Sequence, residues 1–525
     1  MNDTVTIENL LIENASLKAE LAEVNQKLSW LIEQISSNNR KLYGVSSEKS
    51  AYCQPSLFSD AQAGLVTVES AQDVAPSGEN ESTGKKRPIK RGEMSTRLPD
   101  SLPIEVIECE LPEDGRNCPQ CGEAMRDIGR TLVRKEFKII PAKAVVTQFW
   151  GHAYSCRDCE DYADTVPVIK APLPPQVIKG AMCAPETIAH IVVEKCVMGS
   201  PLHRQEKSWQ RNGIPITRQT MANWLIRCSQ DYFEPIYTEL HRLLLLQTLL
   251  YSDDTVLQVL REPGKPPQSE SRMWLYRTGA DAQNQIILYE YQPDRKKERP
   301  MDFLDGFSGY LVCDGYAAYH SLPGNIIVVG CLAHVRSKFV DALKCLKDNE
   351  QKGSLALTGK MYCDKLFDID RDLAGKSFED RYKVRMAKAA PVLDEFQGWL
   401  ESVNQYVAKK SKLGQAVTYA LNQWKYVIRY LLDGRIECSN NRSERSIKPF
   451  VINRKNFLFA TSVEGAKAAA VLHSLTETAM ENGLNPFEYL TYVLRSACAG
   501  NIREDAALLQ KLLPHNAPDS CKAMT

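Results

Sequence analysis

The chain of 525 residues has no run of about 18 or more apolar residues, and its N-terminus is acidic and polar. A helix that spans a bilayer needs about 20 mostly apolar residues, and a secretory signal needs a basic start before an apolar stretch. The sequence therefore predicts neither a membrane span nor a signal peptide. We expect a cytoplasmic protein with no membrane partner.

An excess of basic charge is also absent. Lys and Arg together number 65, as do Asp and Glu, so the formal net charge is zero. This balance argues against coating of nucleic acid by the whole surface, so any contact with DNA has to come from local basic patches. The length exceeds what one hydrophobic core serves, and the 43% of hydrophobic residues is enough to build several globular domains.

Disulfides are not indicated, although sixteen cysteines occur. Most are scattered singly, as reduced thiols are, but four form two Cys-X-X-Cys pairs. Four thiolates suit tetrahedral Zn²⁺, and the apolar and aromatic residues between the pairs predict ribbon strands. We expect a zinc ribbon at residues 106–166, and not two redox pairs, because no thioredoxin-like context surrounds either pair. One structural zinc is expected on four ligands: Cys118, Cys121, Cys156 and Cys159.

A heptad pattern of apolar residues runs from residue 7 to residue 35. Three-four spacing held over this length predicts a coiled coil at residues 1–40. Asn14 lies at a seam position, where a buried amide fixes the register and favours two strands. We expect self-association through this segment; an amphipathic helix packed on its own protein is the alternative.

Residues 41–105 are expected to form a linker, because residues 55–84 are poor in aromatics and rich in small and polar residues. A basic run ends it. A solvated charge run is the simplest interpretation, but the position just before the zinc motif favours a phosphate contact. The basic residues are Lys85, Lys86, Arg87, Lys90 and Arg91.

Residues 201–228 predict a helix, a turn at Gly213 and a second helix from about Thr217. This is helix-turn-helix spacing, although an ordinary helical hairpin fits the segment equally well. We assign residues 167–232 to a helical DNA-binding region. The exposed side of the second helix should carry side chains that suit base edges or phosphates: Arg218, Gln219 and Asn223.

Three short apolar runs follow, at residues 243–260, 272–279 and 284–293, and predict an antiparallel meander. A polar stretch then leads to a buried strand that ends at Asp314, and a further strand at residues 325–330 leads into Cys331 and His334. This order of strands and crossovers is that of a ribonuclease-H-like domain. We place it at residues 233–456, with a helical insertion at about 340–430.

Two acidic residues lie within or at the end of these apolar strands, Asp253 on the first and Asp314 at the end of the fourth. Burying a carboxylate is costly unless something satisfies it, and a divalent cation does so. The alternatives are a turn at Asp314-Gly315 and a solvent-facing strand residue at Asp253 or Asp254. Both acids together favour a metal site.

The third candidate acid, Glu444, lies in the segment DGRIECSNNRSERSIKP at 433–449. Asn441 and Glu444 have the spacing of a helix capping box, so Glu444 as a cap is one interpretation. Against it, Pro449 is expected to cut the helix short, and donors suited to phosphates crowd the region. Composition and spacing leave both interpretations open. The donors are Asn440, Arg442, Arg445, Lys448, Arg454 and Lys455.

Several motifs together resemble the transposases of the insertion sequence sixty-six family. They are DDTVLQVL at 253–260, DGYAAY at 314–319, GCLAHVRSKF at 330–339, the 433–449 segment and RKNFLFATS at 454–462. KLYGVSSEK at 41–49, the paired cysteine motifs and SLTETAMENGLNPFEYL at 474–490 resemble the same family in the same order. The resemblance extends from about Lys41 to Leu494.

The resemblance implies a metal-dependent strand-transfer enzyme with Asp253, Asp314 and Glu444 at the matching positions, holding two Mg²⁺ or, alternatively, Mn²⁺. Its partners would be transposon ends, target DNA and small accessory proteins encoded by the same element. One departure is that the family usually has Asp-Glu-Thr-Pro where this chain has Asp-Asp-Thr-Val. Asp254 is therefore a rival ligand, although alternation along a strand turns only one of the pair inward. His334 is given a minor role.

The sequence thus predicts a multidomain α/β protein: coiled coil, linker, zinc ribbon, helix-turn-helix, ribonuclease-H-like domain, a C-terminal helical region at 457–497 and a tail at 498–525. The expected function is cleavage and joining of DNA strands, on the nucleoid of a bacterial cell. Two rivals remain. One is a ribonuclease-H-like nuclease or resolvase that cleaves without joining, and the other is a non-enzymatic regulator that binds DNA through its zinc and helix-turn-helix modules.

Overall fold

The computed structural model describes residues 145–150, 152–155, 168–170 and 172–523. The expected coiled coil, the linker with its basic run and the four zinc-motif cysteines lie outside the described residues. Contacts divide the chain into two units, one of which contains everything from Pro174 to Ala523. In the other, the short strands β1 (Ala153–Ser155) and β2 (Val168–Lys170) pair antiparallel. Strand β1 lies within the predicted ribbon, whereas β2 lies just beyond its expected end at residue 166.

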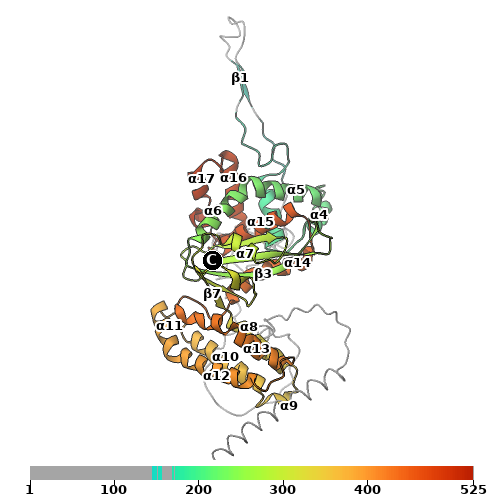
Figure 1. Cartoon of the computed structure of the whole chain (residues 1–525). Coiled ribbons are helices and arrows are strands. Elements are labelled where there is room, and N and C mark those ends of the chain that lie inside the picture. The colour runs from blue at the N-terminus through green and yellow to red at the C-terminus, as the bar shows by residue number, and fades with distance from the viewer. Residues whose placement is uncertain (1–144, 151, 156–167, 171, 524–525) are drawn as a thin grey trace, which may run out of the picture. The chain divides into compact units, whose positions relative to one another are not determined.

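The larger unit is built on a mixed sheet with the strand order β5-β4-β3-β6-β7 (Figure 1). The strands β3 (Leu249–Arg261), β4 (Glu270–Thr278) and β5 (Ile287–Gln292) form the predicted antiparallel meander. Helix α7 (Glu298–Phe303) leads to β6 (Gly309–Cys313) and β7 (Ile326–Gly330), which run parallel to β3. The described part of the larger unit is therefore a mixed α/β fold.

The central strand β3 is long enough to have two parallel neighbours along one edge. Its first residues pair with β6, and its last residues pair with the short strand β8 (Ala460–Ser462). Its side chains alternate, as strand geometry requires. Leu250 belongs to one hydrophobic cluster, whereas Leu249 and Tyr251 belong to another on the opposite face.

Helices precede the sheet: α3 (Pro185–Cys196), α4 (Leu202–Arg211), α5 (Arg218–Cys228) and α6 (Glu234–Leu245), with a π-turn at Ser229–Phe233. Helices α4 and α5 lie where the helix-turn-helix segment predicts them. Gly213 in the turn has φ of 77°, and Thr217 caps α5 by accepting a hydrogen bond from the Thr220 amide. One difference is that Leu243–Leu245 end α6, so the first apolar run begins in a helix.

The region between β7 and the 433–449 segment is helical, as expected. It comprises α8 (Leu332–Leu343), α9 (Asp348–Gln351), α10 (Leu355–Arg371), α11 (Phe378–Val384), α12 (Ala390–Asn404) and α13 (Lys412–Val427). A π-turn at Arg385–Ala389 and a 3₁₀ turn at Ile428–Leu432 join them. Their apolar faces share a core with Tyr251 and Val312 of the sheet.

Helix α14 (Asn441–Phe457) runs through Pro449, contrary to the expectation that this proline ends the helix. A proline inside a helix costs about 3 kcal/mol. Contacts just after it offset that cost, because Phe450 is fully buried and Asn453 donates a hydrogen bond to the Cys196 carbonyl.

Helix α15 (Val463–Glu481) covers the open edge of strand β5. An edge strand presents unpaired backbone groups, which proteins have to cover. The Ser474 hydroxyl accepts from the Tyr289 amide at 2.7 Å, and the Thr478 hydroxyl accepts from the Ile287 amide and donates to its carbonyl. Hydroxyls of a helix therefore replace the missing strand.

The expected C-terminal tail is in fact packed. After α16 (Pro486–Ala499), helix α17 (Ala506–Lys511) and two 3₁₀ turns at Pro514–Asn516 and Asp519–Cys521 return to the helical core. Leu512 and Leu513 are fully buried, and the Asn485 amide donates to the Cys521 carbonyl at 2.8 Å. These apolar residues anchor a segment that its polar composition alone did not reveal. No helix among the described residues is long and apolar enough to cross a membrane.

Candidate active site

Asp253 and Asp314 lie at the same level on neighbouring parallel strands. The last paired positions of β3 and β6 are Tyr251 and Val312, and each aspartate lies two residues further on. The Asp253 carboxylate accepts the Asp254 amide at 2.8 Å, and the Asp314 carboxylate accepts the Tyr316 amide at 3.1 Å. Each side chain is thus oriented by the backbone next to it.

The close approach of helix α13 requires Gly315, which follows Asp314. A Cβ atom at this position would lie 2.6 Å from the Tyr419 hydroxyl and 2.9 Å from the Gln423 side chain. A side chain at position 315 would therefore force the Tyr419 and Gln423 side chains to shift.

Asp254 points to the opposite face of β3, as alternation predicts, but it does not face solvent. Its side chain is 1% exposed and is held by two arginines. Arg295 donates to Oδ1 at 2.7 and 3.1 Å, and Arg272 donates to Oδ2 at 3.2 Å. The alternative of a solvent-facing residue is therefore wrong for Asp254.

Glu444 lies in the first turns of α14, and the structure does not make it a helix cap. The N-cap is Asn440, whose side chain makes no capping hydrogen bond and instead donates to the Ser252 carbonyl at 2.9 Å. The Glu444 side chain is 10% exposed, and its Oε1 atom is buried without a hydrogen-bond partner. The structure therefore leaves this carboxylate available for another role.

Asp314 lies close enough to Asp253 and Glu444 to affect the pKa of both. Burial, followed by the charges of Asp314 and Glu444, raises the pKa of Asp253 well above its ordinary value. Burial also raises the pKa of Glu444, and Asp314 adds to that effect while His334 opposes it. Segments far apart in the sequence thus converge on one acidic cluster.

Cys331 and His334 border this cluster. Cys331 follows β7 and is the N-cap residue of α8, so His334 lies in the first turn of that helix. His334 Nδ1 is 3.8 Å from Glu444 Oε1. Burial lowers the pKa of His334, but Cys331, Glu444 and Asp314 outweigh burial and raise it to about 10.

The donor set fits divalent cations. Burial and the nearby like charges raise the pKa of Asp253, and Glu444 has a buried carboxylate oxygen without a hydrogen-bond partner, so a cation at this cluster would lower the free energy. Carboxylate oxygens are the ligands that Mg²⁺ prefers. Asp253, Asp314 and Glu444 would hold such ions.

Sequence reasoning missed Arg295, which appeared only as one basic residue of a polar stretch. Its guanidinium bonds Asp254, lies 3.7 Å from Asp314 Oδ2 and stacks over the Tyr316 ring at 3.7 Å. The Tyr316 hydroxyl donates in turn to the Arg295 carbonyl. No sequence spacing links these residues, because only the fold brings the loop after β5 to the end of β6.

The residues predicted to bind DNA divide into two groups on α14. Arg445, Lys448 and Lys455 are exposed. Arg442, by contrast, pairs with Glu437 at 3.0 Å, and Arg454 donates to Thr255 Oγ1 at 3.1 Å and to the Val256 carbonyl. On α5, the predicted Arg218, Gln219 and Asn223 are all exposed.

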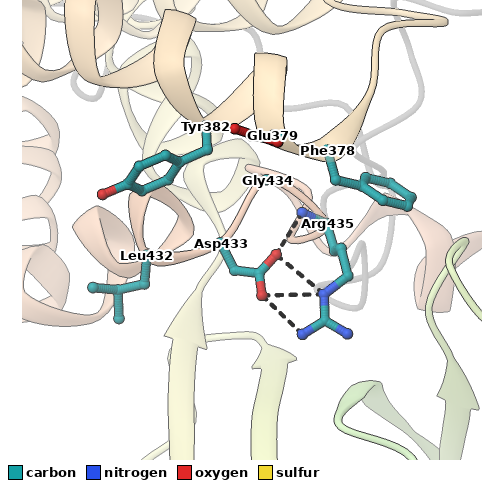
Figure 2. A pocket seen from close by; sticks show the side chains of 7 residues that line it. All are labelled: Phe378, Glu379, Tyr382, Leu432, Asp433, Gly434 and Arg435. Atoms are coloured by element: carbon teal, nitrogen blue, oxygen red, sulfur yellow. Dashed lines mark hydrogen bonds and ion pairs between the residues drawn. The ribbon is translucent and has the colours of Figure 1, made fainter.

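The motif that opens the 433–449 segment has a structural role. Asp433 and Arg435 form a bidentate ion pair, and Arg435 also reaches Asp281 at 3.2 Å. A Cβ atom on Gly434 would lie 1.8 Å from the Phe378 carbonyl oxygen, so only glycine fits. A shallow pocket surrounds these residues (Figure 2), and none of the three candidate acids lines it. The pocket therefore shares no lining residue with the acidic cluster.

Fold and site together define a mixed α/β protein with a buried acidic cluster where two parallel strands meet a helix. Residues 180–468, more than half of the chain, match the family described as Transposase IS66 family. Residues 116–160 match the zinc-finger binding domain of transposase IS66. The chain belongs to the IS66 family of transposases.

Full-length relatives are similar to the chain over nearly all of its length. The uncharacterized protein y4jD of Sinorhizobium fredii (strain NBRC 101917 / NGR234) is 29% identical, with 96% of this chain and 98% of that protein covered. The uncharacterized protein y4qI of the same strain is 28% identical, with 97% and 93% covered. The Drosophila P element transposase strand transfer complex aligns with a TM-score of 0.32 at 12% identity, over 63% of this chain and 94% of that chain.

Proposed function

We propose that the chain cleaves and joins DNA strands at the ends of an insertion sequence, using divalent metal ions held by Asp253, Asp314 and Glu444. The observation that carries the proposal is the convergence of these three carboxylates, where burial, followed by the charges of Asp314 and Glu444, raises the pKa of Asp253. Membership of the transposase family supports the same assignment.

We further propose that the catalytic domain is ribonuclease-H-like. Three antiparallel strands followed by two parallel ones, in the order β5-β4-β3-β6-β7, are the arrangement that such a domain requires. In this arrangement the first and fourth strands are neighbours. The proposal accounts for one acid on β3 and one directly after β6.

Two bound divalent ions, about 3.5 to 4 Å apart, would activate an attacking hydroxyl and stabilise the leaving oxygen. The chain itself orients the carboxylates, through the Asp254 and Tyr316 amides, and excludes water from the Glu444 side of the cluster. Water is the first nucleophile and frees a 3′ hydroxyl at the transposon end. That hydroxyl then attacks target DNA in the same site, without a covalent protein–DNA intermediate.

DNA contacts are proposed on two exposed surfaces. The first is the outer face of α14, where Arg445, Lys448 and Lys455 are three to ten positions apart and share the helix that carries Glu444. The second is the start of α5, with Arg218, Gln219 and Asn223. Basic side chains near the reaction centre suit phosphates, and amides suit base edges.

The remaining assignments fall outside the described residues and stay proposals. One Zn²⁺ is held by Cys118, Cys121, Cys156 and Cys159, within the segment that matches the family's zinc-finger domain. The basic run at 85–91 adds phosphate contacts, and residues 7–35 associate as a two-stranded coiled coil. Accessory proteins of the same element are further partners.

The decisive experiment uses amide variants of the three acids. D253N, D314N and E444Q keep the size of each side chain and remove the negative charge that the cations require. Strand cleavage and strand transfer are measured on a labelled transposon end with Mg²⁺, and DNA binding is measured in parallel. Both reactions should fall together by orders of magnitude, with no additivity between variants, because the residues act as one unit.

Three results would contradict the proposal in different ways. Cleavage by the unmodified protein without joining would indicate a nuclease or resolvase. Binding to DNA without any cleavage would indicate a regulator. An active E444Q variant would remove Glu444 from the set of metal ligands.

A further inference from the structure

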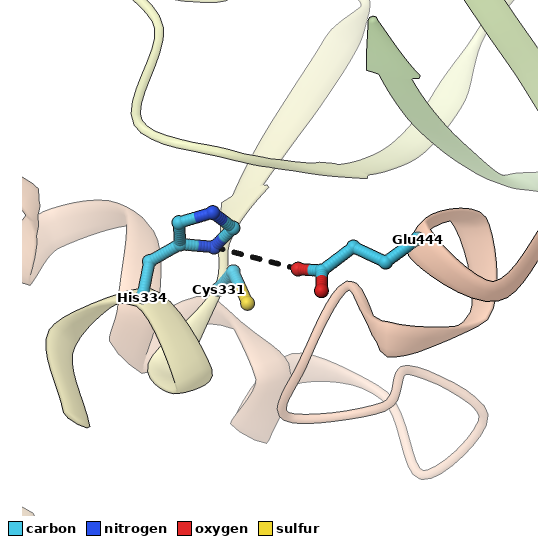
Figure 3. A group of neighbouring side chains, drawn as sticks. All are labelled: Cys331, His334 and Glu444. Atoms are coloured by element: carbon cyan, nitrogen blue, oxygen red, sulfur yellow. Dashed lines mark ion pairs between the residues drawn. The ribbon is translucent and has the colours of Figure 1, made fainter. Parts of the chain in front are cut away.

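We propose that Cys331, His334 and Glu444 form a second kind of metal site, selective for a borderline-soft divalent cation such as Zn²⁺ or Co²⁺. The three side chains gather where β7 ends, α8 begins and α14 starts (Figure 3). Each offers one ligand atom, and these atoms lie within 4.8 Å of one another. The site uses none of the four cysteines of the zinc motif, although it shares Glu444 with the acidic cluster.

Two of the three ligand atoms are buried polar atoms without a hydrogen-bond partner. They are His334 Nδ1 and Glu444 Oε1, which face each other at 3.8 Å. This separation is too long for a hydrogen bond. It is close to the distance of roughly 3.3 to 3.7 Å between two ligands of one tetrahedral Zn²⁺. A cation placed between them would satisfy both atoms with only a small movement.

Cys331 supplies the selectivity. Its side chain is buried, with 4% exposure, and its sulfur accepts the Asn440 amide at 3.1 Å. This hydrogen bond orients the sulfur, as groups around a metal commonly orient its ligands. Thiolate and imidazole ligands favour Zn²⁺ and Co²⁺, whereas Mg²⁺ requires an octahedral set of oxygens. Binding releases the thiol proton to solvent.

Occupation of this site has a consequence that rests on the proposed function. If Glu444 Oε1 coordinates a cation that is also bound by the Cys331 thiolate, the negative charge of this carboxylate is no longer fully available to Mg²⁺ beside Asp253 and Asp314. A soft cation would therefore withdraw one of the three carboxylates and inhibit strand cleavage. The site is a means of inhibition built from residues next to the reaction centre.

Binding is tested on the full-length protein with Co²⁺ as the probe. Wild type, C331S and H334Q are titrated, with C313S as the matched control, because Cys313 is also a fully buried thiol next to the cluster but is not one of the three ligands. Wild type and C313S should bind one Co²⁺ equivalent more than C331S, with thiolate-to-cobalt absorption. H334Q should bind that equivalent at least tenfold more weakly.

Circular dichroism and thermal melting establish that each variant is folded, and E444Q, which keeps both the thiol and the imidazole, provides a further test of binding. Equal numbers of equivalents in wild type, C331S and H334Q would overturn the proposed site. Full-affinity binding by E444Q would remove Glu444 from it.

Inhibition is tested separately by adding Zn²⁺ to cleavage reactions in excess Mg²⁺, with each rate divided by that variant's own rate without added zinc. The zinc concentration that halves the rate should be at least tenfold higher for C331S than for C313S. If the protein binds the additional Co²⁺ equivalent but never cleaves DNA, the metal site is supported and the proposed function is refuted. If it cleaves DNA but does not bind that equivalent, the proposed function is supported and the metal site is refuted.

Discussion

The two faces of strand β3 treat adjacent, chemically identical residues in opposite ways. Asp254 lies on one face with its carboxylate bonded by Arg272 and Arg295. Asp253 lies on the other face, where the nearby charges that raise its pKa are carboxylates. Among the described residues, arginines compensate the negative charge of Asp254 but not that of Asp253.

The charges around a carboxylate distinguish a structural acid from a functional one more clearly than its burial does. Burial raises the pKa of both aspartates. A buried carboxylate that the fold has paired with arginines is part of the scaffold. A buried carboxylate among like charges calls for a cation from outside the chain, and perturbed groups of this kind gather at functional sites.

The largest expected effect breaks the contrast directly. D253N should reduce strand cleavage by several orders of magnitude, because the amide removes a charge that the proposed cations require. D254N should retain much more activity, since Asp254 lies on the far face. Initial rates of cleavage with Mg²⁺ check this, normalised to the fraction of folded protein. Equal losses in the two variants would make Asp254 a second ligand.

For stability the order of the two variants reverses. D254N removes the nearest carboxylate of Arg272 and Arg295 and turns one acceptor oxygen into an amide donor that faces a guanidinium donor. Arg272 keeps only the longer contact to Glu270 at 3.6 Å and Arg295 the one to Asp314 at 3.7 Å, and both guanidinium groups are partly exposed to water. We expect a loss of about 1 to 3 kcal/mol in the free energy of unfolding, less than for a fully buried pair. Urea denaturation in buffer without Mg²⁺ measures it. D253N should show no such loss, and a destabilised D253N would count against the contrast.

The pH dependence of stability gives a smaller effect. Because the folded-state pKa of Asp253 is raised, its favourable contribution is fully present below the unfolded pKa of about 3.9 and is lost as pH rises through the folded value. Without Mg²⁺, D253N should therefore be more stable than wild type at neutral pH, and the difference should shrink toward acid. Urea denaturation across the pH range measures this, and a difference that grows toward acid would contradict it.

The strand elements could be predicted because their signals are local. The apolar runs specify β4, β5, β6 and β7, and the sequence predicts Asp253 within a strand and Asp314 at the end of one, a single residue beyond the observed end of β6. Between α4 and α5, Gly213 allows the positive φ of the turn and the Thr217 hydroxyl caps the second helix, so both features can be predicted from the residue types alone. Local signals were also misleading where tertiary contacts decide, as at Pro449 inside α14 and Leu243 at the end of α6.

The partners of the acids could not be predicted, because they depend on which segments meet. Nothing in the sequence links Arg295 to Asp254, or His334 to Glu444, and the capping interpretation of Glu444 stayed open until the position of Asn440 was known. The packed C-terminus is similar. Leu512 and Leu513 form part of a core that also contains residues far away along the chain, such as Ile188 and Phe233.

Helix α14 repeats the contrast with basic residues, and this gives the smallest expected effect. Arg454 points inward and donates to β3, whereas its neighbour Lys455 is exposed beside Arg445 and Lys448. If the outer face follows a DNA backbone, K455Q should lower the slope of log affinity against log salt concentration by about 1, the value for one phosphate contact. Affinity should fall severalfold for specific and nonspecific DNA alike, because phosphate contacts carry no sequence information.

R454Q is the matched control for K455Q, since it removes the same charge from the next position. It should lower the stability of the β3–α14 contact and leave the salt slope of the folded protein unchanged. Fluorescence anisotropy at several salt concentrations measures both variants, and equal slopes for K455Q and wild type would place the DNA away from this face of α14.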